Sequence, residues 1–252
     1  MKKVSLLIVM IITQFCYGQN FELTLEKAEL GDAKAQYEIG QVYEFGKKGM
    51  SKNIKKAIFW YEKSAIQNIQ GAQYRLGLIY DQEKGVLFDK QKAIFWFKKN
   101  AENGNSNTQI RLARMYYNGD SVDRDYEQSF YWFKKFAEQE LKQVSGEMEL
   151  WNGEIIKGKF YDERLPTVMN LVGISYNTGL GVLVDKKQAF YWFEKSAEYE
   201  NSSAQLQLGK MYITGDSGKI DLAKAAFWVK KSYENGNEEA KLTWDKYELW
   251  KY

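Results

Sequence analysis

Histidine is absent from the 252 residues of this chain, and cysteine and proline each occur only once. Without histidine the chain can build neither a histidine-based catalytic triad nor a histidine general base, and it lacks the commonest zinc ligand. Only carboxylates, tyrosines and lysines remain for catalysis, and no pattern pairs two of them. We therefore expect no catalytic residues, no metal site and no cofactor.

The single cysteine, Cys16, stands in an N-terminal segment with the three parts of a secretory signal. A basic start is followed by the apolar run "VSLLIVMII" and then by small residues near a cut site. Residues 1–18 are therefore predicted to be a signal peptide cleaved after Gly18, which exports the protein to the periplasm or the extracellular space. The alternatives are a retained membrane anchor, for which the run is too short, and a lipid anchor on Cys16, which Phe15 disfavours. Cleavage would leave a mature chain with no cysteine, no disulfide and no integral membrane segment.

The charge of the chain is close to balanced. Its formal net charge of +3 falls to +1 when Lys2 and Lys3 are removed with the signal. A nearly neutral chain provides no electrostatic reason to bind nucleic acid or an anionic membrane. The scarcity of proline, together with abundant helix-forming residues, favours an all-α fold.

Nine residues of the type "AIFWYEKSA" recur five times, each with tryptophan at the fourth position. A fixed spacing in this range is typical of repeat architectures. The interval of 60 residues equals one period plus about 24, so one repeat boundary carries an insertion. The five tryptophans are spaced 36, 36, 60 and 36 residues apart: Trp60, Trp96, Trp132, Trp192 and Trp228.

Each repeat reads as two helices. In the second, Ala57, Trp60 and Tyr61 begin an apolar face with helical spacing, and Ile58 and Phe59 widen it. A stripe this broad should be covered on two sides, as in a stack of helical hairpins. Residues suited to cap the start of the second helix recur in register: Asn53, Asp89, Asp125, Asp185 and Asp221. Glycines suited to end the first helix recur as well: Gly46, Gly119, Gly179 and Gly215.

A second set of small residues lies in the middle of the first helix, where glycine is unfavourable by up to about 1 kcal/mol relative to alanine. We interpret them as sites of close helix approach and expect the repeat tryptophan to lie against them. The set comprises Gly40, Gly77, Gly173 and Gly209, with Ala113 in the third repeat.

The stretches "AQYRLGLIYDQEKGVLFDKQKAIFWFKKNA" and "GISYNTGLGVLVDKKQAFYWFEKSA" resemble Sel-one-like repeats, a branch of the tetratricopeptide-like helical hairpin family. The resemblance implies an all-α, right-handed α/α solenoid of five helix-turn-helix repeats. We expect an N-terminal cap over 19–30, repeats one to three over 31–139, an insertion over 140–164, repeats four and five over 165–235, and a C-terminal capping helix over 236–252.

In this family the first helices line the concave side of the superhelix. The resemblance therefore implies a scaffold that binds a protein or peptide partner there, through residues one and four positions after the small mid-helix residue. Because these positions vary between repeats, they suit a surface for one specific partner, although drift of an unused surface would look the same. They are Gln41, Glu44, Leu78, Asp81, Arg114, Tyr117, Ile174, Asn177, Lys210 and Ile213.

The insertion places Asn-Gly between two runs that contain apolar residues, which predicts a β-hairpin. Trp151 and Phe160 would be its aromatic anchors. The alternative is a longer second helix followed by a disordered loop.

Two other functional classes remain as alternatives to a binding scaffold. One is a cell-wall glycan or peptide hydrolase that uses carboxylates, and the other is a carbohydrate-binding module that uses exposed aromatic residues. The acidic segment "GDSVDRDYEQ" lacks the ligand spacing of a calcium loop. It is interpreted as a turn in which Asp125 caps the following helix.

Overall fold

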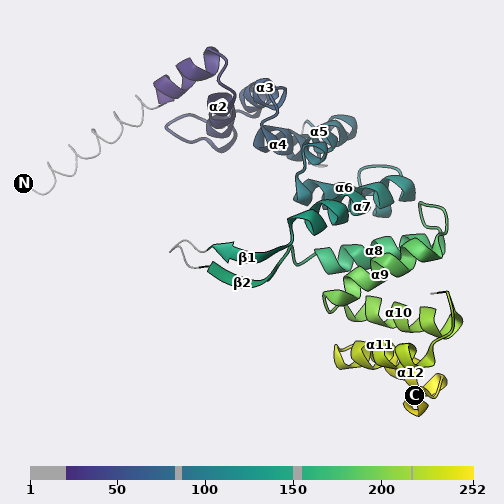
Figure 1. Ribbon diagram of the computed structural model, residues 1–252. Coiled ribbons are helices and arrows are strands. Elements are labelled where there is room, and N and C mark those ends of the chain that lie inside the picture. Colours follow the sequence, from purple (N-terminus) through teal and green to yellow (C-terminus); the bar gives the residue numbers. More distant parts are fainter. Residues whose placement is uncertain (1–20, 83–86, 150–154, 217) are drawn as a thin grey trace, which may run out of the picture. The chain divides into compact units, whose positions relative to one another are not determined.

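The computed structural model describes residues 21–82, 87–149, 155–216 and 218–252. The predicted signal peptide lies outside the described residues. The chain divides into two compact units, 1–108 and 109–252. Residues 21–29 are helical, and the remaining helices of the first unit are α2 (Ala33–Phe45), α3 (Ile54–Ala65), α4 (Gln70–Tyr80) and α5 (Lys90–Glu102), as labelled in Figure 1.

The second unit follows the same alternation of helices. The unit boundary falls in the first turn of α6 (Ser106–Asn118), and α12 packs on α11 near the end of the chain. Two strands, β1 (Ser145–Glu149) and β2 (Ile155–Phe160), interrupt the series. The other helices are α7 (Tyr126–Gln143), α8 (Leu165–Thr178), α9 (Lys186–Glu198), α10 (Ser202–Thr214), α11 (Leu222–Glu234), α12 (Glu238–Lys246) and the short η1 (Leu249–Lys251).

These helices form a stack of helical hairpins in each unit. In the first unit α2 packs on α3, α3 on α4, and α4 on α5. In the second, each helix from α7 to α12 packs on the next one in sequence. The all-α solenoid of helical repeats predicted from the tryptophan period is confirmed.

The predicted helix boundaries hold at both ends. At each second helix the capping side chain accepts a hydrogen bond from a backbone amide, as Asn53 does from Lys56 and Asp125 from Gln128, both at 3.0 Å. Gly46 ends α2 in the left-handed conformation with φ 65°, and Gly179 ends α8 with φ 82°. In that conformation a side chain would be strained.

The mid-helix glycines allow close helix contact, but their partner is not the tryptophan. A Cβ atom at Gly40 would lie 2.5 Å from the ring of Tyr61, and one at Gly77 would lie 2.4 Å from Phe97. The prediction was wrong by one residue: the side chain that follows the tryptophan occupies the space. The tryptophan precedes this residue by one position and does not contact the glycine in this way. It is buried nonetheless: Trp132 and Trp192 are each only 2% exposed. Trp228, in the last repeat, is half-buried.

The broad apolar face of the second helix was expected to be covered on two sides, but one position on it is left exposed to solvent. The aromatic residue before each tryptophan remains about half exposed, as Phe59 does at 51%. Its ring contacts the neighbouring indole edge to face, with centroids 5.1 Å apart for Phe59 and Trp60. The corresponding residues are Phe95, Tyr131, Tyr191 and Phe227.

Buried polar side chains bind the helices within and between hairpins. Within hairpins, Ser64 donates to the carbonyl oxygen of Ala33 at 2.6 Å, and serines and an asparagine repeat this contact elsewhere. Between hairpins, Gln73 of α4 donates to the carbonyl oxygen of Ala65 at the end of α3, at 3.1 Å. Because a buried polar group is unfavourable without a partner, these bonds fix how successive helices meet.

The insertion contains the two strands, which pair antiparallel with Glu147 opposite Lys157 and Glu149 opposite Ile155. They lie on either side of the Asn-Gly sequence that predicts a hairpin, and the turn itself is outside the described residues. The α7 helix that precedes them is 18 residues long, against 12 or 13 for the other second helices. The insertion thus begins with an extended helix and continues as strands.

Candidate functional site

The first-helix residues singled out from the sequence fall into two groups. In the first unit Gln41, Leu78 and Asp81 are half-buried. Gln41 donates a hydrogen bond to the hydroxyl of Tyr37 at 3.0 Å. Each of these three side chains is therefore only partly accessible to a partner.

Glu44 differs most from its expected place on an open surface. It is only 6% exposed, and its carboxylate accepts a hydrogen bond from the hydroxyl of Tyr61 at 2.6 Å. Arg75 pairs with the same carboxylate, its Nε donating at 2.8 Å. Burial and the adjacent Glu44 carboxylate raise the pKa of the Tyr61 phenol well above its ordinary value. Glu44 thus joins α2, α3 and α4, and its side chain is occupied within the protein.

In the second unit, some of the predicted residues also have internal partners. Asn177 accepts from Lys186 at 2.6 Å, and Lys210 pairs with Glu239 at 2.5 Å. Ile213 packs against the apolar cluster that joins α10, α11 and the C-terminal residues.

Three predicted residues, Arg114, Tyr117 and Ile174, come together around one cavity of about 240 Å³. Arg114 and Tyr117 of α6 are exposed at its edge, and Ile174 of α8 is half-buried. Among the described residues, no acidic side chain pairs with Arg114. The rest of the lining is largely apolar and comes from two helices. Helix α7 supplies Tyr126, Ser129, Phe130 and Phe133, and α8 with the loop after it supplies Leu171, Ser175 and Leu180.

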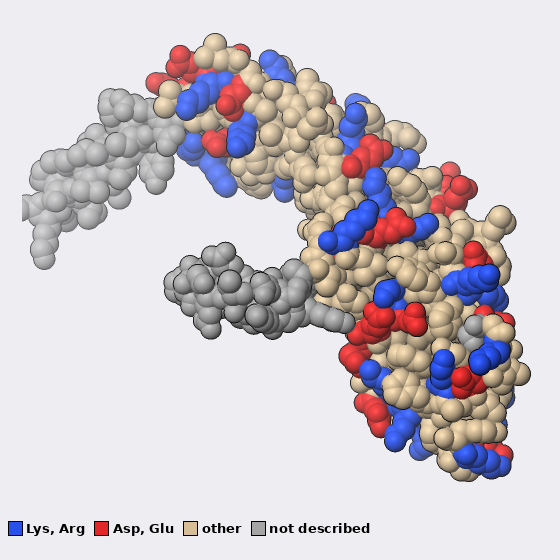
Figure 2. All heavy atoms as spheres, in the orientation of Figure 1, with Lys and Arg blue, Asp and Glu red and all other residues tan. Residues whose placement is uncertain are grey.

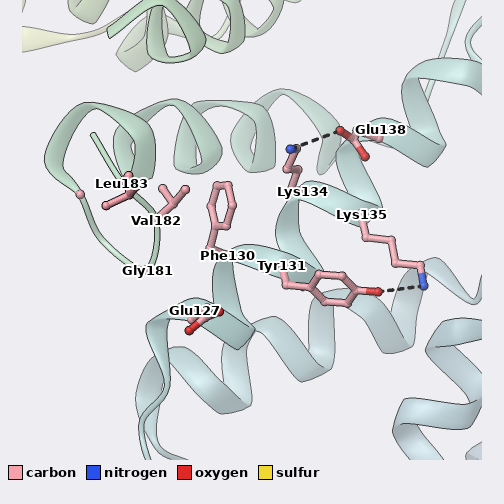
Figure 3. A pocket seen from close by; sticks show the side chains of 10 residues that line it. Glu127, Phe130, Tyr131, Lys134, Lys135, Glu138, Gly181, Val182 and Leu183 are labelled. Atoms are coloured by element: carbon pink, nitrogen blue, oxygen red, sulfur yellow. Dashed lines mark hydrogen bonds and ion pairs between the residues drawn. The ribbon is translucent and has the colours of Figure 1, made fainter. Parts of the chain in front are cut away.

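A larger cavity, of about 880 Å³, lies on another face of α7 (Figure 3). Phe130 lines both cavities. About three turns of α7 contribute one stripe of side chains to the larger one, and Val182 and Leu183 of the loop between α8 and α9 lie on its other side (Figure 3). The stripe comprises Glu127, Phe130, Tyr131, Lys134, Lys135 and Glu138.

Sequence reasoning missed this second cavity, although a signal for it was present. Tyr131 belongs to the series of aromatic residues that precede the tryptophans, and it is 48% exposed. A position that is aromatic in every repeat and exposed in every repeat marks a surface rather than a core. The spacing alone could not distinguish the two, because residues 131 and 132 are both apolar.

The anchors predicted for the insertion have different outcomes. Trp151 lies outside the described residues. Phe160 is the last residue of β2, where its backbone pairs with Ser145.

Acidic and basic side chains are interspersed over the face of the molecule shown in Figure 2. Within the described residues, none of the helices combines the length and the apolar character that crossing a bilayer requires. Those residues also contain no group of three or more cysteine or acidic side chains placed to hold a metal ion.

Comparison with known proteins identifies the repeats. The Sel1 repeat profile matches residues 33–69, 71–105, 106–141, 166–198 and 202–237. No curated protein matches the chain.

Two solved structures share the fold. One is a protective antigen present in uropathogenic Escherichia coli strains, with 29% identity and a TM-score of 0.53, over 89% of this chain and 43% of that chain. The chain therefore spans less than half the length of the antigen. The other is a Sel1 repeat protein from Oxalobacter formigenes, with 24% identity and a TM-score of 0.52, over 91% of this chain and 86% of that chain.

Proposed function

Because the chain belongs to the Sel1 repeat family of helical-repeat interaction scaffolds, we propose that it is an exported protein that binds a protein or peptide partner on its first-helix surface. The observation that carries this proposal is the cavity bordered by Arg114, Tyr117 and Ile174. Repeat scaffolds bind through side chains that vary on a constant frame, and these three vary between repeats.

The chemistry of this cavity suits an apolar side chain next to an acidic group. Phe133 and Leu171 offer an apolar interior, and Tyr117 packs edge to face on Tyr126 with ring centroids 5.6 Å apart. Arg114 stands exposed beside them. Arginine and tyrosine are among the residues enriched at the hot spots of interfaces.

Reversing the charge of Arg114 should release the partner. We expect Arg114→Glu to weaken partner binding by about 30-fold, which corresponds to about 2 kcal/mol, the level of an interface hot spot. The measurement is affinity purification of the tagged protein from the exporting cells, with quantitative mass spectrometry of what is bound, followed by titration of the recovered partner.

Lys34→Glu is the matched control, because Lys34 is an exposed basic residue at the start of α2 and lines neither of the cavities on α7. It makes the same change in net charge and should leave the partner bound. Equal loss with both variants would indicate a general charge effect. An unchanged partner list with Arg114→Glu would exclude this cavity as the binding site.

Export is the second part of the proposal, and the N-terminal signal pattern supports it. N-terminal sequencing of protein recovered from the envelope or the medium should begin at Gln19. Replacing Leu6 and Leu7, in the apolar run, with arginine should keep the protein inside the cell, because signal function depends on that run. Protein recovered outside the cell that still begins at Met1 would contradict the cleavage, and protein found only inside would contradict export.

A further inference from the structure

The larger cavity on α7 is a built feature rather than a gap between side chains. Its outer wall is the loop after α8, which begins at Gly179. Gly181 holds this loop against the start of α7: its φ is +76°, and a Cβ atom there would lie 2.0 Å from the carbonyl oxygen of Tyr126. A close contact between two backbones therefore fixes the loop beside the helix.

The same contact presents two apolar side chains toward α7. Val182 and Leu183 follow Gly181 and face Phe130 across the cavity (Figure 3). Leu183 is 88% exposed. Apolar side chains arranged around an open cavity favour a ligand that covers them.

The charged groups along the stripe divide into paired and unpaired ones. Lys134 lies 3.7 Å from Glu138 and thus already has an acidic partner. Lys135 has only aromatic partners among the described residues: its Nζ donates to the hydroxyl of Tyr131 at 3.5 Å and lies 5.1 Å from the ring centre of Trp132. Glu127, in the first turn of the helix, has no basic partner among the same residues. One unpaired cation and one unpaired anion therefore lie along a single cavity.

Their spacing limits the ligand. Lys135 and Glu127 are eight residues apart on one helix, which corresponds to about 12 Å along its axis at about 1.5 Å per residue. An extended peptide advances about 3.3 Å per residue, so about four residues cover that distance. In an extended chain, alternate side chains share one face. Charged residues four positions apart therefore face the cavity together with the residue midway between them, which would meet Phe130 and Leu183.

We propose that this cavity is a second recognition site, which takes an extended peptide segment with an acidic, an apolar and a basic residue at alternate positions. The acidic residue pairs with Lys135, the basic residue pairs with Glu127, and the apolar residue is covered by Phe130, Val182 and Leu183. The site shares Phe130 with the cavity at Arg114, but Lys135, Glu127 and Leu183 line only the larger cavity.

The test uses two fluorescein-labelled synthetic peptides, Ser-Glu-Ser-Leu-Ser-Lys-Ser and Ser-Lys-Ser-Leu-Ser-Glu-Ser, one for each chain direction, with fluorescence anisotropy as the readout. We expect saturable binding of one of them by the full chain. Leu183→Ser should weaken it by about tenfold or more, the usual effect of losing one apolar contact in a pocket. Because Leu183 is already exposed, its loss should leave the fold intact, which circular dichroism checks.

Val184→Ser is the matched control, since Val184 is on the same loop, is 57% exposed and does not line the cavity. It should keep the affinity within about twofold, as surface substitutions usually do, and Arg114→Glu should do the same.

Charge reversal provides the specific test of orientation. Lys135→Glu should lose the original peptide and gain one in which lysine replaces its glutamate. Failure of both peptides to saturate, equal loss with Leu183→Ser and Val184→Ser, or no gain on charge reversal would each overturn the proposal.

Discussion

Replacing Trp132 with alanine is expected to lower the free energy of unfolding by about 3–5 kcal/mol, the usual effect of truncating a large buried aromatic residue. Trp132 is only 2% exposed, and its ring is packed edge to face by Tyr131 at 4.9 Å. The substitution removes this buried surface and leaves a cavity that the surrounding helices fill only in part. Urea denaturation followed by circular dichroism measures the change without relying on tryptophan fluorescence.

Trp228→Ala is the internal control, because Trp228 holds the same position in the last repeat and is only half-buried. Its effect should be clearly smaller. Trp132→Phe should also be milder than Trp132→Ala: it keeps most of the apolar volume, and it removes an indole Nε1 that is buried with no hydrogen-bond partner among the described residues. A loss below about 1 kcal/mol for Trp132→Ala would show that this ring contributes little to the core.

The second large effect is expected at the buried network of the first unit. Arg75→Gln removes the cation beside Glu44, whose side chain is only 8% exposed. An unpaired buried carboxylate destabilises a fold by about 3–5 kcal/mol. We expect about 3 kcal/mol, at the lower end of that range, because Arg75 is itself 25% exposed. Urea denaturation of the full chain provides the measurement.

Adding Glu44→Gln should recover part of that loss, since a neutral amide needs no cation. A double-mutant cycle should therefore show a coupling energy of about 1 kcal/mol or more between the two positions. Lys210→Gln breaks an ion pair with Glu239 in which the side chains are 36% and 62% exposed, so it should change stability by less than about 0.5 kcal/mol. Strictly additive effects at Glu44 and Arg75 would mean that they do not act as a pair.

Much of the fold could be predicted because the same sequence pattern recurs in each of the five repeats. A single tryptophan among apolar residues does not indicate a fold, but five at a regular interval define a repeat period. The recurring capping residues then indicate where the helices begin and end. The errors occurred where neighbouring apolar residues compete. The sequence pattern did not show whether the tryptophan or the following Tyr61 fills the space beside Gly40, because a rotation of the helix by one residue exchanges them.

The candidate site was harder to predict because it depends on pairing across repeats. Glu44 reads as a surface carboxylate until Tyr61 and Arg75, 17 and 31 residues away, are placed around it. Arg114, Tyr117 and Ile174 were selected from their position in the repeat, without any indication of a cavity. The larger cavity could not be anticipated either, because it requires a loop in one repeat to be fixed by Gly181 against a helix in another.

The buried hydrogen bonds between helices have a consequence for the place that carries the insertion. In the third repeat Phe136 stands where other second helices have serine or asparagine, and in the fourth Met169 stands where other first helices have glutamine; both are fully buried. Contacts between apolar side chains have no required direction, whereas a hydrogen bond does. Met169 therefore leaves the junction of α7 and α8 without the glutamine-to-carbonyl bond that Gln36, Gln73 and Gln205 make to the preceding helix. The insertion thus lies at a junction whose buried contact at this position is apolar and has no required direction.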